Sequence, residues 1–280
     1  MRIGGGIPKS YSDPDGWIEL VRDLEYSAVL APVDYTDAVE VKQTYIKYAR
    51  GNNLVFGEVG IWKNSLAKDE QERREALEFS RQQLALADEL HANCCVNIAG
   101  TTGEIWDGCY KSNYSGDTYA LIVDTVRSII DSVKPRHTFY TLEPMPWMHP
   151  DSPDDYLQLI KDIDRKAMGV HLDYTNMINS VDRYLNSTEF IKDCYKKLGP
   201  YIKSIHAKDV YISNILPCGI REVAPGQGSI DFAGVLQLTE QLGPDTTLFV
   251  EHMQTYEEYK NAVSYIRGVA GKEKVNIKKI

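Results

Sequence analysis

The sequence has neither an excess of positive charge nor a basic stretch. Among its 280 residues, 40 Asp and Glu outnumber 31 Lys and Arg, and the formal net charge at pH 7 is −9. Proteins that bind nucleic acids usually concentrate Lys and Arg on one face. We therefore expect no nucleic-acid partner, and we interpret the acidity as a contribution to solubility.

Paired cysteines and long apolar segments are also lacking. The five cysteines are an odd number and include no C-x-x-C pair, which argues against a disulfide framework and against a structural zinc site. No stretch approaches the roughly 18 apolar residues of a transmembrane helix, and the N-terminal MRIGGG has no apolar signal core. The expectation is a cytoplasmic protein, in a reducing compartment, without a membrane partner.

What the sequence does contain is a regular alternation of short apolar runs and longer amphipathic stretches. The apolar runs predict eight strands, at Arg2–Ile7, Ser27–Val33, Leu54–Ile61, Cys94–Gly100, Thr138–Met145, Met168–Asp173, Tyr201–Val210 and Thr246–Met253. The amphipathic stretches predict eight helices, at Asp15–Tyr26, Thr36–Arg50, Lys68–Leu90, Tyr119–Val133, Pro153–Ile163, Ser187–Leu198, Ile230–Leu242 and Tyr256–Val269.

Eight strands that are each followed by a helix, with no linker between them, are typical of an α/β protein with a (β/α)8 TIM barrel. The length of 280 residues is close to the roughly 250 of such a barrel, so we expect one domain over residues 1–280. An open doubly wound sheet is the alternative, because periodicity alone does not exclude it.

Four of the predicted strands in the second half of the chain end in a residue that can bind a metal. Glu143, Asp173, His206 and Glu251 follow one another at intervals of 30, 33 and 45 residues, each about one strand–helix unit. The carboxyl ends of barrel strands meet at one face, so these side chains should converge there. Three carboxylates in close contact raise one another's pKa unless a cation lies between them.

Any one of these four residues could instead bond a loop or cap a helix, but four in register favour a metal site. Three oxygen ligands and one imidazole suit one divalent ion. Mn²⁺ is the preferred candidate, and Mg²⁺, Co²⁺ and Zn²⁺ are also compatible.

Several strings around these residues resemble the xylose isomerase-like barrel superfamily, and the resemblance covers essentially the whole chain. The strings are LEPMPW (Leu142–Trp147), HLDYTN (His171–Asn176), IHAKD (Ile205–Asp209), APGQGSIDF (Ala224–Phe232) and VEH (Val250–His252). This group includes sugar-phosphate isomerase/epimerase-like proteins, ketose 3-epimerases, inosose-processing enzymes and endonuclease IV-type proteins.

The resemblance implies that the four residues bind the metal and that Glu143 and Glu251 exchange protons with the substrate, as in the epimerases of the group. Endonuclease IV-type members use a trinuclear zinc cluster with additional histidines. The six histidines of this chain and its lack of a basic surface fit that branch poorly. Many members carry a second histidine where this chain has Asn176, which can bond a sugar hydroxyl but carries no charge.

Three other histidines need an interpretation. His149 lies in a proline-bracketed loop six residues beyond Glu143, where it is either a substrate-facing acid or base or a surface-loop residue. The catalytic subunits of C-glycoside deglycosidases are similar barrels that use a metal and a histidine base on 3-keto glycosides. His171 should lie deeper in the barrel in a supporting role, and His252 should point towards the helices and be buried.

Further residues are candidates for contacts with the substrate, each with a structural alternative. Carboxylate, amide and cationic groups could bond sugar hydroxyls or anions, or else fix loops, and indole rings could pack on the apolar face of a sugar or anchor a loop. The candidates are Glu58, Asn97, Trp106, Trp147, Asn176, Lys208 and Arg221.

Three functions are consistent with these residues. The first is a metal-dependent isomerase or epimerase that acts on a keto or aldose sugar, or a derivative, through a metal-stabilised enediolate. The second is a lyase that catalyses β-elimination from a 3-keto glycoside with His149 as acid or base. The third is a metal-free binding protein that retains only the barrel. The expected partner is a small sugar or glycoside, and a homo-oligomer or a small second subunit remains open.

Overall fold

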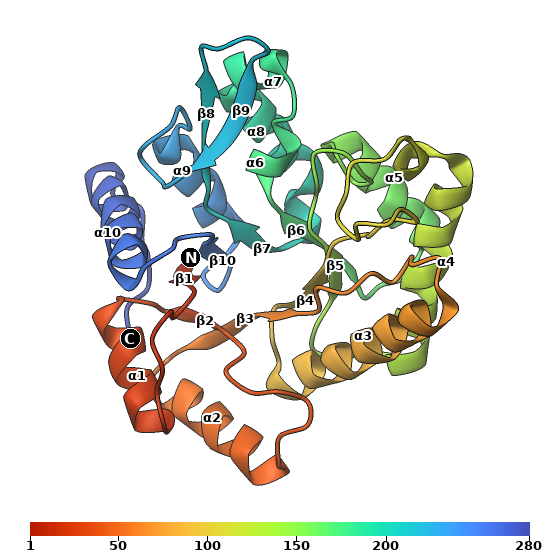
Figure 1. Ribbon diagram of the computed structural model, residues 1–280. Helices are drawn as coiled ribbons and strands as arrows, with labels where there is room; N and C mark the ends of the chain where they lie inside the picture. The colour runs from red at the N-terminus through yellow and green to blue at the C-terminus, as the bar shows by residue number, and fades with distance from the viewer.

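The computed structural model describes residues 1–280. Eight parallel strands lie in the order β1-β10-β7-β6-β5-β4-β3-β2 and curl into a nearly closed barrel (Figure 1). They are β1 (Arg2–Gly5), β2 (Ala28–Leu30), β3 (Val55–Gly60), β4 (Cys94–Asn97), β5 (Tyr140–Leu142), β6 (Met168–Leu172), β7 (Ile202–His206) and β10 (Thr247–Val250). The two edge strands meet, because the amide of Ser27 donates to the carbonyl of Ile3 at 2.8 Å. The predicted single-domain (β/α)8 barrel is thus confirmed over the open sheet.

The predicted helices form the outer layer of the barrel (Figure 1). They are α1 (Pro14–Asp23), α2 (Val39–Gly51), α3 (Glu70–Leu90), α4 (Gly116–Val133), α5 (Pro153–Ile163), α8 (Ser187–Leu198), α9 (Phe232–Leu242) and α10 (Tyr256–Glu273). Local signals set where they begin: Asp13 and Ser152 cap α1 and α5 just before a proline, and Thr255 forms a capping box with Glu258. None of the helices is both long enough and apolar enough to span a membrane.

Packing between the two layers supplies the core. It is one cluster of 64 buried hydrophobic residues. A side chain such as Ile3 or Leu248, fully buried in a strand, contributes about 1.5–3 kcal/mol relative to an exposed position. Because the barrel strands are buried on both faces, a polar side chain in them needs partners inside the protein. The polar residues of the second-half strands are the starting point for the site.

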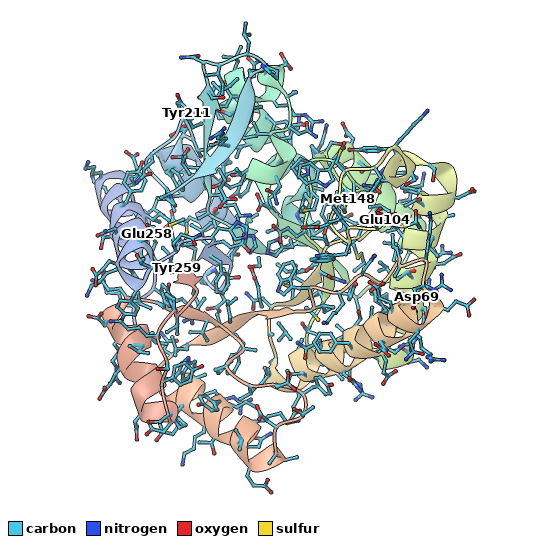
Figure 2. The ribbon with its side chains drawn as sticks, in the orientation of Figure 1. Asp69, Glu104, Met148, Tyr211, Glu258 and Tyr259 are labelled. Carbon is cyan, nitrogen blue, oxygen red and sulfur yellow. The ribbon has the colours of Figure 1, made fainter.

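The predicted seventh strand was wrong at its carboxyl end. β7 ends at His206, and the chain then forms an antiparallel hairpin of β8 (Asp209–Ser213) and β9 (Gly219–Val223) that projects from the barrel (Figure 1). Tyr211, labelled in Figure 2, lies on this hairpin and is exposed. Four short elements were also not predicted: η1 (Lys111–Tyr114), α6 (Tyr174–Met177), α7 (Val181–Leu185) and η2 (Gly199–Tyr201).

Asp209 ties the base of this hairpin to the glycine-containing turn that follows it. Its buried carboxylate accepts hydrogen bonds from the amides of Val210, Gly226, Gly228 and Ile230, at 2.8–3.0 Å. Gly226 has φ +89°, a conformation that favours glycine. The strings IHAKD and APGQGSIDF therefore form one unit, in which the turn has a backbone role and fixes the segment next to β7.

Candidate metal centre

Four side chains converge at the carboxyl ends of β5, β6, β7 and β10. Glu143, Asp173 and Glu251 each follow the last residue of their strand, and His206 is the last residue of β7. One ligand atom from each lies within 4.8 Å of those of the other three. The strands are consecutive neighbours in the sheet. The predicted convergence is confirmed, and we refer to these residues as the four-ligand group.

The central atoms of the four-ligand group make no well-aligned hydrogen bond. His206 Nδ1 lies 3.4 Å from Glu143 Oε1, 3.4 Å from Asp173 Oδ2 and 3.0 Å from Glu251 Oε2. Asp173 Oδ2, His206 Nδ1 and Glu251 Oε2 are buried and make no well-aligned hydrogen bond. Buried polar atoms normally have a partner. Carboxylate oxygens and one imidazole nitrogen around a common point fit a divalent cation.

The short helix α6 explains how two of these carboxylates are oriented. Asp173 caps α6: its Oδ1 accepts the amide of Asn176 at 2.9 Å, which leaves Oδ2 free to face the centre. The Asn176 side chain donates to Glu143 Oε1 and to the carbonyl of Pro144, both at 3.0 Å. Asn176 thus holds Glu143 in place by hydrogen bonding, without adding a charge.

Lys208 supplies a positive charge within the four-ligand group. Its side chain is 1% exposed, and Nζ lies 2.7 Å from Asp173 Oδ2, 2.6 Å from Glu251 Oε2 and 3.5 Å from Glu143 Oε1. Burial alone would lower the pKa of Lys208, but the surrounding carboxylates, Asp173 first, raise it well above its usual value. The charge of Lys208 is already shared among protein carboxylates, which does not favour the predicted contact with a hydroxyl or anionic group of the substrate.

The same charges keep the carboxylates ionised. Burial alone would raise the pKa of Glu251, but attraction to His206 and Lys208 outweighs it and lowers the pKa to about 2. The pKa of Asp173 is also lowered against the effect of burial, mainly by Lys208 and then by His206. Both groups therefore carry their charge at neutral pH.

The match to a known family agrees with this geometry: residues 18–269 match the xylose isomerase-like TIM barrel. The chain belongs to this family. A curated relative, the uncharacterized protein MJ1311 of Methanocaldococcus jannaschii, is 26% identical over 203 residues, which are 71% of this chain. The match spans 64% of the length of that relative.

Solved structures with similar folds extend across the family. A xylose isomerase-like TIM barrel protein from Mycobacterium smegmatis, in complex with magnesium, has a TM-score of 0.67 and 15% identity over 94% of this chain and 90% of that one. A 3-keto-D-glucoside 4-epimerase from E. coli has a TM-score of 0.67 and 15% sequence identity, and the match covers 96% of this chain and 99% of that one. A D-psicose 3-epimerase, solved in the presence of D-fructose, has a TM-score of 0.69 and 16% sequence identity, and the match covers 97% of this chain and 100% of that one. At these identities the likeness is one of fold.

Beneath the four-ligand group, Glu58 reaches across the barrel from β3. Its Oε1 lies 3.1 Å from His171 Nε2 and accepts a hydrogen bond from Ser204, and its Oε2 lies 3.5 Å from His206 Nε2. Both Glu58 and His171 are buried. The predicted contact of Glu58 with a sugar hydroxyl is not what its geometry favours, because protein groups already occupy both oxygens. His171 has the supporting position that the sequence predicted.

Asn97 and His149 also have their polar atoms engaged by the protein. The buried Asn97 amide bonds the backbone of Lys63 at 3.3 and 2.9 Å, which favours loop fixing over the predicted substrate contact. His149 Nδ1 lies 2.8 Å from Asp155, and the His149 ring packs edge-on against Tyr114 and Tyr119. His149 lines neither the cavity that contains Glu251 nor the cavity that contains Asn176. Its position therefore does not favour the predicted acid–base role.

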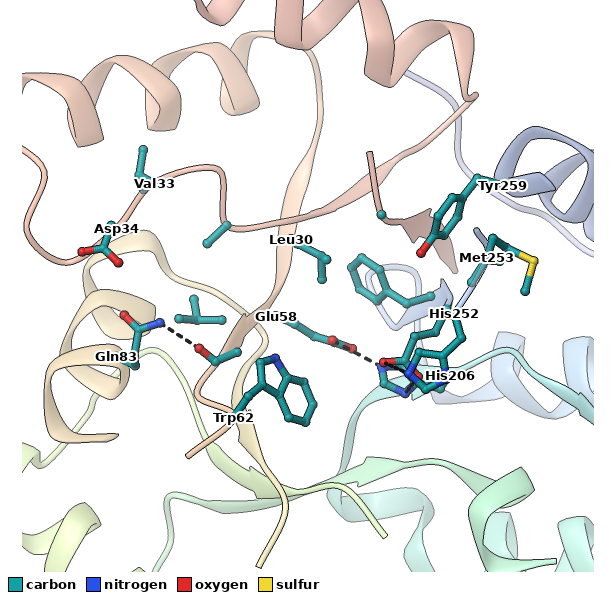
Figure 3. A pocket seen from close by; sticks show the side chains of 17 residues that line it. Leu30, Val33, Asp34, Glu58, Trp62, Gln83, His206, His252, Met253 and Tyr259 are labelled. Carbon is teal, nitrogen blue, oxygen red and sulfur yellow. Dashed lines mark hydrogen bonds and ion pairs between the residues drawn. The ribbon is translucent and has the colours of Figure 1, made fainter. Parts of the chain in front are cut away.

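One cavity is lined by two members of the four-ligand group, and a second is lined by Asn176, which donates to Glu143. The Trp62 cavity has a volume of about 660 Å³ and includes His206 and Glu251 in its wall (Figure 3). The Trp147 cavity, of about 580 Å³, is lined by Trp147, Asn176 and Arg221 among others. The predicted substrate contacts Trp147, Asn176 and Arg221 are thus brought together, whereas Trp106 packs against the hydrophobic core and lines neither cavity.

The prediction that His252 is buried was wrong. Its side chain is 59% exposed and lines the Trp62 cavity, with Nδ1 3.0 Å from Glu222 Oε2 and Nε2 3.5 Å from Glu251 Oε1. The backbone of His252 has φ +58°, so the alternation of side chains along β10 does not continue to this residue. Its ring therefore lies at the Trp62 cavity and not among the helices. Glu222 lies on β9. The sequence analysis did not identify it as a site residue because it did not predict the β8–β9 hairpin.

Proposed function

We propose that the protein is a divalent-metal-dependent isomerase or epimerase of a keto or aldose sugar, or of a derivative of one. The observation that carries the proposal is the convergence of the four-ligand group, in which one ligand atom from each residue lies within 4.8 Å of those of the other three. The fold shared with a 3-keto-D-glucoside 4-epimerase and a D-psicose 3-epimerase supports the reaction class.

Glu143, Asp173, His206 and Glu251 would hold one ion. The three oxygens and one nitrogen suit Mn²⁺ best, and Mg²⁺, Co²⁺ and Zn²⁺ remain compatible. When bound, the ion would act as a Lewis acid that stabilises the negative charge of an enediolate.

The two glutamates are assigned the proton transfers. Glu251 lines the Trp62 cavity and is ionised at neutral pH, so it can accept the proton next to the substrate carbonyl. Glu143 follows β5 and is held by Asn176 of α6, so it would pass a proton taken from solvent to the other face of the substrate or to the neighbouring carbon, while Glu251 returns its proton to solvent. In the reverse reaction the two glutamates would exchange these roles as proton acceptor and proton donor.

Solvent exchange tests the proposed reaction directly. A panel of ketoses and aldoses is incubated in D₂O with protein loaded with Mn²⁺ and with protein treated with a chelator. We expect deuterium to enter the carbon next to the carbonyl of at least one sugar only when metal is present, and we expect one ion per chain by metal analysis. A purified protein with no stoichiometric ion, and with no metal-dependent exchange, would instead support the metal-free binding barrel.

A lyase gives a different product in the same experiment. Release of a leaving group from a 3-keto glycoside, abolished in His149→Ala, would favour β-elimination over isomerisation. The bonds of His149 to Asp155 and its packing against two tyrosines lead us to expect little effect of this substitution.

Glu58 provides a further prediction about metal affinity. A carboxylate on the far nitrogen of a ligating histidine fixes the ring and its tautomer, and loss of such a partner typically costs 10–100-fold in metal affinity or activity. We expect Glu58→Gln to weaken Mn²⁺ binding within that range, because Oε2 no longer carries the charge that faces His206 Nε2. Competition with a metal-sensitive dye measures the change, and Glu40→Gln, on the exposed surface of α2, is the control. Unchanged affinity in Glu58→Gln would show that Glu58 only fills space.

A further inference from the structure

The wall of the Trp62 cavity contains no Lys and no Arg. Of its 17 lining residues, three are carboxylates, Asp34, Glu58 and Glu251, and nine are hydrophobic. Binding of a phosphate normally relies on Arg or Lys donors or on a helix N-terminus. The two imidazoles in the wall, of His206 and His252, already lie 3.0 Å from Glu251 and Glu222, so the wall offers an anionic group no unpaired cation.

Large apolar side chains line this cavity while remaining open to solvent. Leu30 is 42% exposed and Trp62 is 41% exposed, and Met253 is partly exposed on the other side, next to Tyr259. Figure 3 shows Leu30 and Trp62 among the side chains that line the cavity together with Glu58 and His206. Aromatic and aliphatic walls with a few polar groups are typical of sites that hold the apolar part of a small molecule.

The backbone directs Trp62 to this position at an energetic cost. Eight non-glycine residues have a left-handed backbone, and six of them end helices, where this conformation is common. The other two are Trp62 (φ +51°) and His252 (φ +58°), which follow β3 and β10 and both line the cavity. Strain of this kind in residues other than glycine concentrates at functional sites.

Gly60 makes room for the indole of Trp62. A Cβ on Gly60 would lie 2.3 Å from Trp62 Nε1, so any larger residue there would displace the ring. The indole of Trp62 therefore packs against the backbone of Gly60 at the end of β3 and does not lie free on a loop.

The volume of the cavity also bears on its occupant. About 660 Å³ falls within the ~300–1,000 Å³ that is typical of sites for drug-sized ligands, and is more than one sugar ring fills. The Trp147 cavity is lined by Asn179 and Arg221 but by no member of the four-ligand group. A sugar ring at the four-ligand group would thus leave the Trp62 cavity for a substituent.

We propose that the substrate is an uncharged keto sugar that carries an apolar substituent, as in an aryl or alkyl glycoside with a carbonyl on its sugar ring, and that the substituent packs against Leu30, Trp62 and Met253. This inference rests on the proposed function, since it assumes that the sugar ring lies at the four-ligand group. It assigns the Trp62 cavity to the part of the substrate that does not react.

Calorimetric titration of the Mn²⁺-loaded protein tests the proposal. The probes are methyl and 4-nitrophenyl glycosides of glucose, galactose and xylose, together with glucose 6-phosphate. We expect at least one 4-nitrophenyl glycoside to bind tenfold or more tightly than its methyl counterpart, and we expect glucose 6-phosphate to bind more weakly than either. Trp62→Ala should reduce the aryl-to-methyl ratio to near one.

Trp147→Ala is the matched control, because it removes an indole from the Trp147 cavity and should leave the ratio unchanged. Circular dichroism of both variants verifies that they are folded. Equal affinities for aryl and methyl glycosides, tighter binding of the phosphate, no binding of any glycoside, or an equal loss in Trp147→Ala would each overturn the proposal. The proposed function fails separately, through the absence of metal or of metal-dependent exchange with unsubstituted sugars.

Discussion

Replacement of Glu251 by Gln is expected to reduce turnover by roughly 10²–10⁴-fold, the usual contribution of a positioned acid or base. The amide has nearly the same shape but cannot accept a proton, and it removes one negative charge from the four-ligand group. The pKa of Glu251 is lowered to about 2, so its carboxylate is already ionised at neutral pH and would be able to accept a proton. Progress curves with the sugar that shows deuterium exchange measure the effect.

Two controls separate loss of catalysis from loss of structure or metal. Thermal unfolding should show that Glu251→Gln remains folded, and metal analysis should show whether the ion is retained. Glu257→Gln, at the exposed start of α10, should retain full turnover. Near-normal turnover in Glu251→Gln would exclude the proposed proton transfer through this residue.

Replacement of Lys208 by Met should destabilise the metal-free protein by about 3–5 kcal/mol, the cost of removing one partner from a buried ion pair. Lys208 Nζ lies within 3.5 Å of three carboxylates of the four-ligand group, and methionine leaves these charges without their nearest cation. Added Mn²⁺ should restore most of the difference, because a divalent ion can neutralise the same oxygens. Thermal or urea unfolding with chelator and with Mn²⁺ measures both values.

The pH dependence of this loss has a definite sign. Lys208 lowers the pKa of Asp173 and Glu251 below their unfolded values, so it stabilises the fold above those unfolded values, and this contribution disappears as pH falls through the folded ones. The deficit of Lys208→Met should therefore be larger at pH 7 than at pH 4. Lys203→Met, on β7 and over the ring of Phe139, is the control and should not respond to Mn²⁺. A metal-independent deficit would mean that Lys208 acts through packing alone.

The elements that could be predicted are those with a local cause. The 21-residue α3, for example, is amphipathic and begins at a capping Asp69, so the periodic pattern and the cap are both visible in the sequence. The β8–β9 hairpin could not be separated from β7, because no Gly or Pro between Tyr201 and Val210 marks the point at which the chain changes its pairing partner. Which strand a segment pairs with is not a local property.

The site divides in the same way. The positions of Glu143, Asp173, His206 and Glu251 could be predicted because parallel barrel strands place equivalent ends together. The substrate contacts predicted for Glu58, Asn97 and Lys208 were not supported, since each has found partners on distant segments: His171, Lys63 and Asp173, respectively. A polar residue at a strand end has several potential partners, and only the packed protein selects among them.

The sequence by itself determined the barrel, the order of its strands and helices, and the meeting of four ligands at one face, because these follow from a periodic pattern repeated in order along the chain. The tertiary structure alone decided that Lys208 shares its charge with those ligands, that Glu58 supports His206 from below, and that Trp62 and His252 turn into a cavity. Those relations depend on distances between residues far apart in the chain and on backbone conformations that hydrophobic periodicity does not encode.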